Sequence, residues 1–140
     1  MKKLALVAFF ALIAGIGFAQ EKSGALPLDK NEVRVEYATV RWNATTHDFG
    51  KIEQGVPVTH EFTFTNTGKV PFIIANAQPS CGCTAPDWTK TPVPPGGSGF
   101  VKATFNAGTQ GPFNKTITVT SNLEGGITLL TIKGEVTVTQ

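Results

Sequence analysis

Two cysteines separated by a single glycine are the residues best suited to chemistry in this sequence. They lie in the segment Ser80-Cys81-Gly82-Cys83-Thr84 and are the only cysteines in the chain. In an extended segment, side chains two residues apart point the same way, with Cα atoms about 6.4 to 6.8 Å apart, at the upper edge of disulfide reach. A kink at Gly82 would bring them closer. Such a disulfide would close a very short loop, so it would stabilise the fold only weakly.

Three interpretations of this pair are open. The first is structural: two small, semi-buried residues, or a local disulfide that shapes a bend beside Trp88. The second is a soft-metal site, chiefly for Cu(I), because two convergent thiolates are suitable ligands, which makes Cys81 and Cys83 candidate metal ligands. The third is thiol exchange with another protein, although the spacing is not the C-x-x-C redox motif and no βαβ pattern surrounds it. We favour the structural interpretation.

The other residues of types that take part in catalysis predict no catalytic site. His47 and His60 are the only histidines, and His47 is followed directly by Asp48. A serine such as Ser80 or Ser98 would complete the residue types of a hydrolase triad, but triads are defined by geometry and the G-x-S-x-G motif is absent. The spacing of cysteines and histidines is a weak zinc signal, and no nucleotide-binding glycine motif occurs. We therefore expect no enzyme, no cofactor and a structural role for His47.

Short β-strands are expected to position these residues, and no long helix is expected. Runs rich in Val, Ile, Phe and Thr are cut by Gly, Pro and Asn, without helical periodicity. The expected runs cover about residues 33–42, 46–52, 61–65, 70–77, 100–105, 115–120 and 127–138. About seven strands at this spacing predict an all-β, immunoglobulin-like β-sandwich. The two cysteines are too close in sequence to form the inter-sheet disulfide of antibody domains.

Alternation within the runs predicts which side chains form the core. Phe62 and Phe64 share one face of their strand, because strand side chains alternate with period two. The turn composition of residues 66–69 predicts a hairpin between the strands on either side. The mixed phase of the last run predicts a bulge near Leu130. The same reasoning directs Phe72, Ile74, Val101, Ala103, Phe105, Ile117 and Val119 inward.

The N-terminal residues differ in kind from the rest. Lys2 and Lys3 precede an almost uninterrupted apolar stretch that ends in small residues around Ala19, which is the pattern of a secretory signal peptide. A membrane anchor is the alternative, but the stretch is shorter than the about 20 apolar residues that a spanning helix needs. We expect cleavage after Ala19 and a periplasmic or secreted protein with no transmembrane segment after cleavage.

The remaining chain divides into two parts and carries little net charge. Residues 20–32 are polar and lack apolar periodicity, so they predict a flexible leader, and residues 33–140 form the expected domain. The chain has 12 basic and 10 acidic residues, and loss of Lys2 and Lys3 with the signal peptide would make these numbers equal. The other basic residues are scattered singly. Because nucleic-acid binding normally requires a basic patch, no nucleic-acid partner is expected.

Five short motifs stand out along the chain: His47-Asp48-Phe49-Gly50-Lys51-Ile52, Phe62-Thr63-Phe64-Thr65-Asn66-Thr67-Gly68, Ser80-Cys81-Gly82-Cys83-Thr84, Pro95-Gly96 and Gly111-Pro112-Phe113-Asn114-Lys115. Together they resemble one bacterial family, the domain of unknown function 1573. The order and spacing match through nearly all of residues 46–136. The resemblance implies an exported β-sandwich, similar to immunoglobulin-like modules of the major-sperm-protein and cilia-associated type, that binds other macromolecules. It transfers no catalytic residue.

These observations predict a non-enzymatic exported module. Its sheet edges and loops would contact a protein or envelope partner, whose identity the sequence does not reveal. The alternative is a periplasmic protein that binds copper or exchanges thiols through Cys81-Gly82-Cys83. The absence of any methionine after Met1 argues against a methionine-rich copper site.

Overall fold

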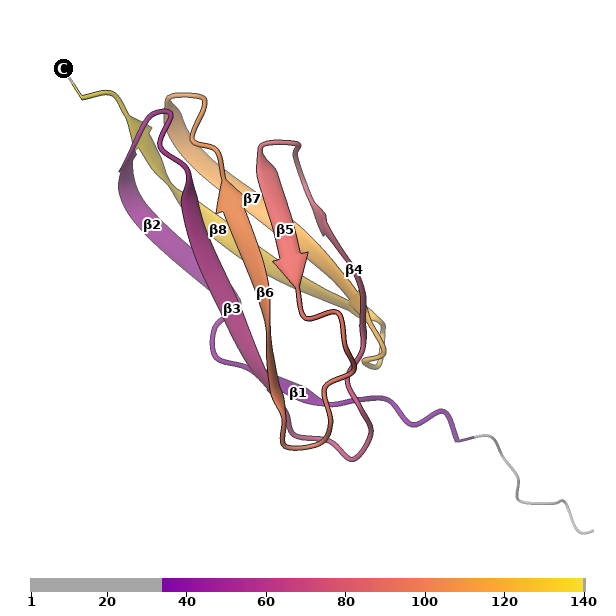
Figure 1. Ribbon diagram of the computed structural model, residues 1–140. Helices are drawn as coiled ribbons and strands as arrows, with labels where there is room; N and C mark the ends of the chain where they lie inside the picture. Colours follow the sequence, from indigo (N-terminus) through magenta and orange to yellow (C-terminus); the bar gives the residue numbers. More distant parts are fainter. Residues whose placement is uncertain (1–33, 140) are drawn as a thin grey trace, which may run out of the picture. The chain divides into compact units, whose positions relative to one another are not determined.

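Two four-stranded sheets make up the protein in the computed structural model, which describes residues 34–139 (Figure 1). Sheet 1 contains, in spatial order, β1 (Val40–Trp42), β3 (Val58–Asn66), β6 (Ser98–Phe105) and β5 (Thr84–Trp88). Sheet 2 contains β2 (Thr46–Glu53), β8 (Ile127–Thr137), β7 (Gly111–Ser121) and β4 (Ile74–Pro79). The predicted immunoglobulin-like β-sandwich is confirmed, with eight strands in place of about seven.

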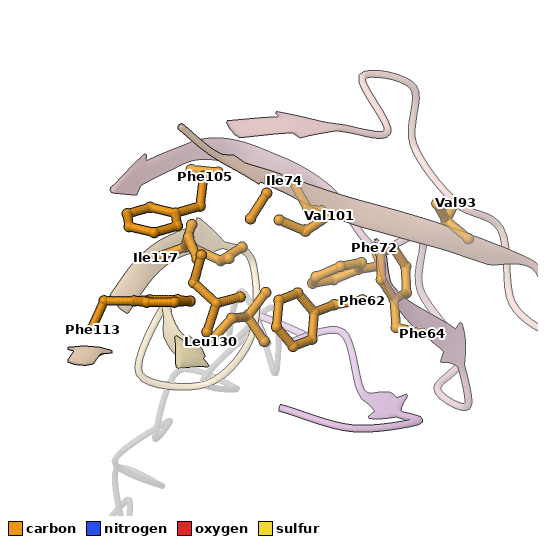
Figure 2. Close-up of a cluster of buried hydrophobic side chains, with 14 of the residues drawn as sticks. Phe62, Phe64, Phe72, Ile74, Val93, Val101, Phe105, Phe113, Ile117 and Leu130 are labelled. Atoms are coloured by element: carbon orange, nitrogen blue, oxygen red, sulfur yellow. The ribbon is translucent and has the colours of Figure 1, made fainter. Parts of the chain in front are cut away.

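The core lies between the sheets and consists mainly of inward-facing residues of β3, β6, β7 and β8, together with buried residues outside the strands such as Phe72 and Val93 (Figure 2). Phe62 and Phe64 on β3 are each 1% exposed, which confirms the predicted alternation. Phe64 packs edge-on against Phe72, with ring centroids 4.8 Å apart. Burial of one such side chain contributes roughly 1.5 to 3 kcal/mol. The other buried residues predicted from the sequence are Phe72, Ile74, Val101, Ala103, Phe105, Ile117 and Val119.

The predicted hairpin across residues 66–69 is wrong. β3 belongs to sheet 1 and β4 to sheet 2, so the chain crosses between the sheets here. The buried amide of Asn66 donates to the carbonyls of Val70 and Val93, and its Oδ1 accepts a hydrogen bond from the Gly68 amide. These bonds hold the connection in a path that leads away from sheet 1. Turn composition alone does not distinguish such a crossing from a hairpin.

The predicted bulge near Leu130 is wrong as well. β8 pairs with β7 without a register shift. Leu130 is fully buried, whereas Ile127 and Leu129 are 52% and 58% exposed. The mixed phase of the sequence therefore comes from apolar side chains on both faces of a regular strand. The shift in this sheet lies instead in β2, between Asp48 and Lys51, where β2 pairs with β8.

The first strand is shorter than the run expected at residues 33–42. Ala38 forms a single parallel bridge with Leu123, and β1 covers only Val40–Trp42. The predicted signal peptide at residues 1–19 and the predicted leader at residues 20–32 lie outside the described residues. The described residues form no helix of the length and apolar character needed to cross a membrane.

Candidate functional site

The candidate binding surface is a free edge at the beginning of β8. β2 pairs with β8 in parallel, but this pairing begins only at Thr131, opposite Thr46. The preceding strand of the chain, β1, pairs with β3 in the other sheet. The change of sheet between β1 and β2 therefore leaves residues 127–130 of β8 at an edge of sheet 2 (Figure 1).

The backbone groups of Ile127 and Leu129 point toward this free edge. The Thr131 amide donates to the carbonyl of Thr45, on the β2 side, at 2.8 Å. Backbone direction alternates along a strand, so the odd-numbered residues of β8 all direct their N–H and C=O groups to that side. Among residues 34–139, no strand pairs with that side of Ile127 and Leu129.

The side chains at the same two positions are aliphatic and exposed. On β7, the residues opposite Ile127 and Leu129 are Thr120 and Thr118, so the neighbouring surface is polar. The sequence does not single out these two residues as surface residues. Ile127 and Leu129 share a phase opposite to that of Leu130, and this phase indicates an outward-facing aliphatic pair, not the predicted bulge. Natural sheets normally protect an edge with charges, prolines or bulges, and this edge has apolar side chains instead.

The outer edge of β5, in contrast, offers no backbone amide for pairing. The Thr84 amide donates to the Cys81 carbonyl at 3.4 Å, and the Trp88 amide donates to Oδ1 of Asp87 at 2.9 Å. Pro86, between them, has no amide hydrogen. The donors on that side of β5 are thus occupied or missing, which makes the edge of β5 a poor template for another strand.

The Cys81–Cys83 pair forms a disulfide in the connection between β4 and β5. The two Cα atoms are 5.3 Å apart, closer than in an extended segment, as a kink at Gly82 predicts. The amide of Ser80 donates to the carbonyl of Thr116 on β7, and the Cys83 carbonyl accepts a hydrogen bond from the Asn106 amide. Both ends of the loop are thus held by the backbone. The metal and thiol-exchange interpretations stay predictions.

The aspartate and serines considered for a hydrolase triad, Asp48, Ser80 and Ser98, make separate local contacts in the structure. Oδ1 of Asp48 accepts a hydrogen bond from the Gly50 amide at 2.8 Å, which supports the turn after it. Ser80 Oγ accepts from the Thr116 amide, and Ser98 Oγ bonds to the Thr65 hydroxyl. Within the described residues, none of these recorded bonds links a serine or Asp48 to a histidine.

The two histidines lie against each other at the edge of the sandwich where β2 and β3 meet. His47 is on β2 and His60 is on β3, and their rings are stacked. Burial and the positive charge of His47 both lower the pKa of His60, whereas the negative charge of Glu61 opposes this shift. Among the described residues, no group of three or more side chains of the metal-binding types is gathered in one place.

Several solved structures share this fold. A protein of unknown function from Porphyromonas gingivalis W83 has a TM-score of 0.63 at 17% identity, over 72% of this chain and 48% of that chain. The ASH / PapD-like domain 7 of human CEP192 has a TM-score of 0.58 at 12% identity, over 74% and 89% of the two chains. The secreted serine protease VesC from Vibrio cholerae has a TM-score of 0.54 at 17% identity, over 71% and 23%. At these identities the likeness shows the fold alone.

The chain spans about half the length of the Porphyromonas protein that it matches. No curated protein sequence matches the chain. A family model, in contrast, matches residues 40–136, which cover all eight strands except the last residue of β8. This match confirms the resemblance found in the sequence motifs, and the chain belongs to the family described as Protein of unknown function (DUF1573).

Proposed function

We propose that this protein is an exported, non-enzymatic binding module that takes up an extended segment of a partner protein along residues 127–130 of β8. The observation that carries the proposal is the combination of unpaired backbone groups and exposed aliphatic side chains at Ile127 and Leu129. In β-strand addition, main-chain hydrogen bonds provide affinity and the alternating side chains provide specificity.

The neighbouring strands define what such a partner segment would be. A strand added beside Ile127 would meet the start of β2 near Thr46, so the added segment is short, about four residues or 13 Å. Its side chains next to Ile127 and Leu129 would be apolar, because they would cover exposed aliphatic surface. The partner is therefore a protein with a short, extended segment of alternating apolar residues.

Two further observations support the non-enzymatic and exported parts of the proposal. Asp48 and Ser80 are engaged in separate local hydrogen bonds, and within residues 34–139 neither is bonded to a histidine, which supports a non-enzymatic role. The signal-peptide pattern before Ala19 and the paired Cys81 and Cys83 suit an oxidising compartment outside the cytoplasm. Cell fractionation with an intact mass measurement tests export, since a periplasmic or secreted chain that begins at Gln20 is expected. Full-length protein in the membrane fraction would contradict it.

Peptide selection with matched variants tests the binding surface. Extended peptides selected from a display library on the wild-type protein should lose most of their affinity for the Leu129→Thr variant, which lacks the aliphatic side chain. They should also lose it for Leu129→Pro, which removes an amide hydrogen that points away from β7. Val56 is similarly exposed, at 49%, so Val56→Thr is the matched control and should bind normally. Equal binding by all variants would place the interaction elsewhere.

A further inference from the structure

The surroundings of the Cys81–Cys83 disulfide differ from those of a purely structural bridge. We propose that this disulfide exchanges with a dithiol of another protein, with Cys81 as the attacked sulfur and Cys83 as the leaving thiolate. The inference uses different residues from the β8 edge and does not depend on it.

The two sulfurs occupy different environments, which sets the direction of attack. Both cysteines are half-buried, but only Cys83 packs against the hydrophobic core. Gly82 between them is exposed, and a Cβ built on it would meet nothing within 4 Å. An incoming thiolate approaches a disulfide along the line of the two sulfurs. Because Cys83 packs against the core and Cys81 is not part of that packing, we infer that approach to Cys81 is the less hindered of the two. Cys81 is therefore the sulfur that a thiolate reaches.

Two side chains are placed near Cys83 to stabilise the leaving thiolate once the bond breaks. Thr84 is 3% exposed, and its hydroxyl oxygen lies 4.0 Å from Cys83 Sγ and 3.8 Å from Cys81 Sγ. A buried hydroxyl with few competing partners can donate to a thiolate. Lys115 shares the wall of a pocket of about 210 Å³ with Cys83. A nearby lysine lowers the pKa of a thiol, and a thiol of lower pKa leaves faster.

Breaking this disulfide should cost the folded protein little stability. The loop ends are held by the Ser80 to Thr116 and Asn106 to Cys83 backbone hydrogen bonds, which do not involve the sulfurs. Only one residue separates the cysteines, so the bond removes little entropy from the unfolded chain. A disulfide that is only weakly coupled to folding is also only weakly protected by folding from reduction.

The thiol–disulfide exchange takes place in two steps. The partner thiolate attacks Cys81 Sγ, which forms a mixed disulfide and breaks the Cys81–Cys83 bond; the electron pair stays on Cys83, which then takes a proton from water. The second thiolate of the partner attacks the partner's own sulfur in the mixed disulfide and releases Cys81 as a thiolate, which is also protonated. In total, two electrons and two protons pass from the partner dithiol to Cys81 and Cys83, and the partner leaves as a disulfide.

Reduced glutathione is a suitable probe for the first step. After brief reaction with the folded wild-type protein and an acid quench, mass spectrometry of peptides should find glutathione on Cys81, while circular dichroism keeps its native β-sheet signal. A disulfide that resists glutathione until the protein unfolds would overturn the proposal. Glutathione found equally on Cys83, or loss of the β-sheet signal on reduction, would also overturn it.

Lysine variants test the stabilisation of the leaving thiolate. Loss of a cation that stabilises the leaving thiolate should slow the reaction with glutathione roughly threefold. This result is expected for Lys115→Met, whereas Lys115→Arg should keep the wild-type rate. Lys102→Met is the matched control on the outer face of the other sheet and should also react normally. Equal slowing by Lys115→Met and Lys102→Met would contradict the assigned role.

A further variant separates this inference from the proposed function. The double variant Ile127→Ser with Leu129→Ser should lose peptide binding and keep the wild-type rate of exchange. A slowed exchange in this variant would show that the two sites are not independent, against the inference.

Discussion

His47 and His60 stack face to face, with ring centroids 3.7 Å apart and an interplanar angle of 6°. They come from β2 and β3, which belong to different sheets, so the pair joins the two sheets at one edge of the sandwich. Phe49 lies edge-on to His47, and Phe62 lies edge-on to His60. The pair is thus the polar end of an aromatic cluster.

The lowered pKa of His60 predicts that stability falls in mild acid. Well above pH 6.5 the ring of His60 is neutral in both states, so the free energy of unfolding does not depend on its titration. As the pH falls below 6.5, the unfolded chain binds the proton first, and stability is lost until the pH lies below the folded pKa. Urea unfolding across this range should show the decline, and His60→Gln should reduce it. A variant with the same decline as the wild type would contradict the assignment.

The alternation of buried and outward-facing side chains along β3 predicts that alanine substitutions at adjacent positions cost unequal amounts of stability. Phe64→Ala should cost about 3 to 5 kcal/mol, because it removes a buried ring that packs against Phe72 and Trp42. Thr63 lies on the outer face, and its hydroxyl accepts a hydrogen bond from the exposed side chain of Asn43, so Thr63→Ala should cost well under about 1 kcal/mol. Denaturant unfolding of both variants measures the difference, and equal losses would show that the strand register is wrong.

Substitution by alanine should destabilise the protein at one glycine, Gly134, and leave its stability almost unchanged at another, Gly82. A Cβ at Gly134 would lie 2.7 Å from the carbonyl oxygen of Gly50 and 2.9 Å from the ring of Phe113. Because one of these neighbours is backbone, Gly134→Ala should cost roughly 1 to 3 kcal/mol. Gly82 has nothing within 4 Å, so Gly82→Ala should leave the free energy of unfolding almost unchanged. Thermal or denaturant unfolding distinguishes them, and a stable Gly134→Ala protein would contradict the close packing of β8 against β2.

The disulfide should contribute little to global stability. The double variant Cys81→Ser with Cys83→Ser should lower the free energy of unfolding by no more than about 2 kcal/mol, since the loop that the bond closes is very short. Equilibrium unfolding in the oxidised and reduced states provides the same comparison without mutation. A loss of several kcal/mol would mean that the bridge holds β4 and β5 in place, which the backbone hydrogen bonds of Ser80 and Cys83 are expected to do.

The sequence predicted the parts of the fold that depend on local alternation. Phe62 and Phe64 alternate with polar residues, so their burial could be predicted without knowledge of their partners. The crossing after Asn66 could not, because it depends on long-range bonds to Val93. The free edge at Leu129 was also beyond the sequence, since it arises from the change of sheet between β1 and β2.

Amide hydrogen exchange at Ile127 and Leu129 tests the central claim most directly. In the free protein these amides should exchange much faster than the amide of Leu130, which points toward β7. With a selected extended peptide bound, the amides of Ile127 and Leu129 should become protected, because an added strand accepts their hydrogen bonds. Protection elsewhere on the protein, with Ile127 and Leu129 still exchanging rapidly, would contradict strand addition at β8.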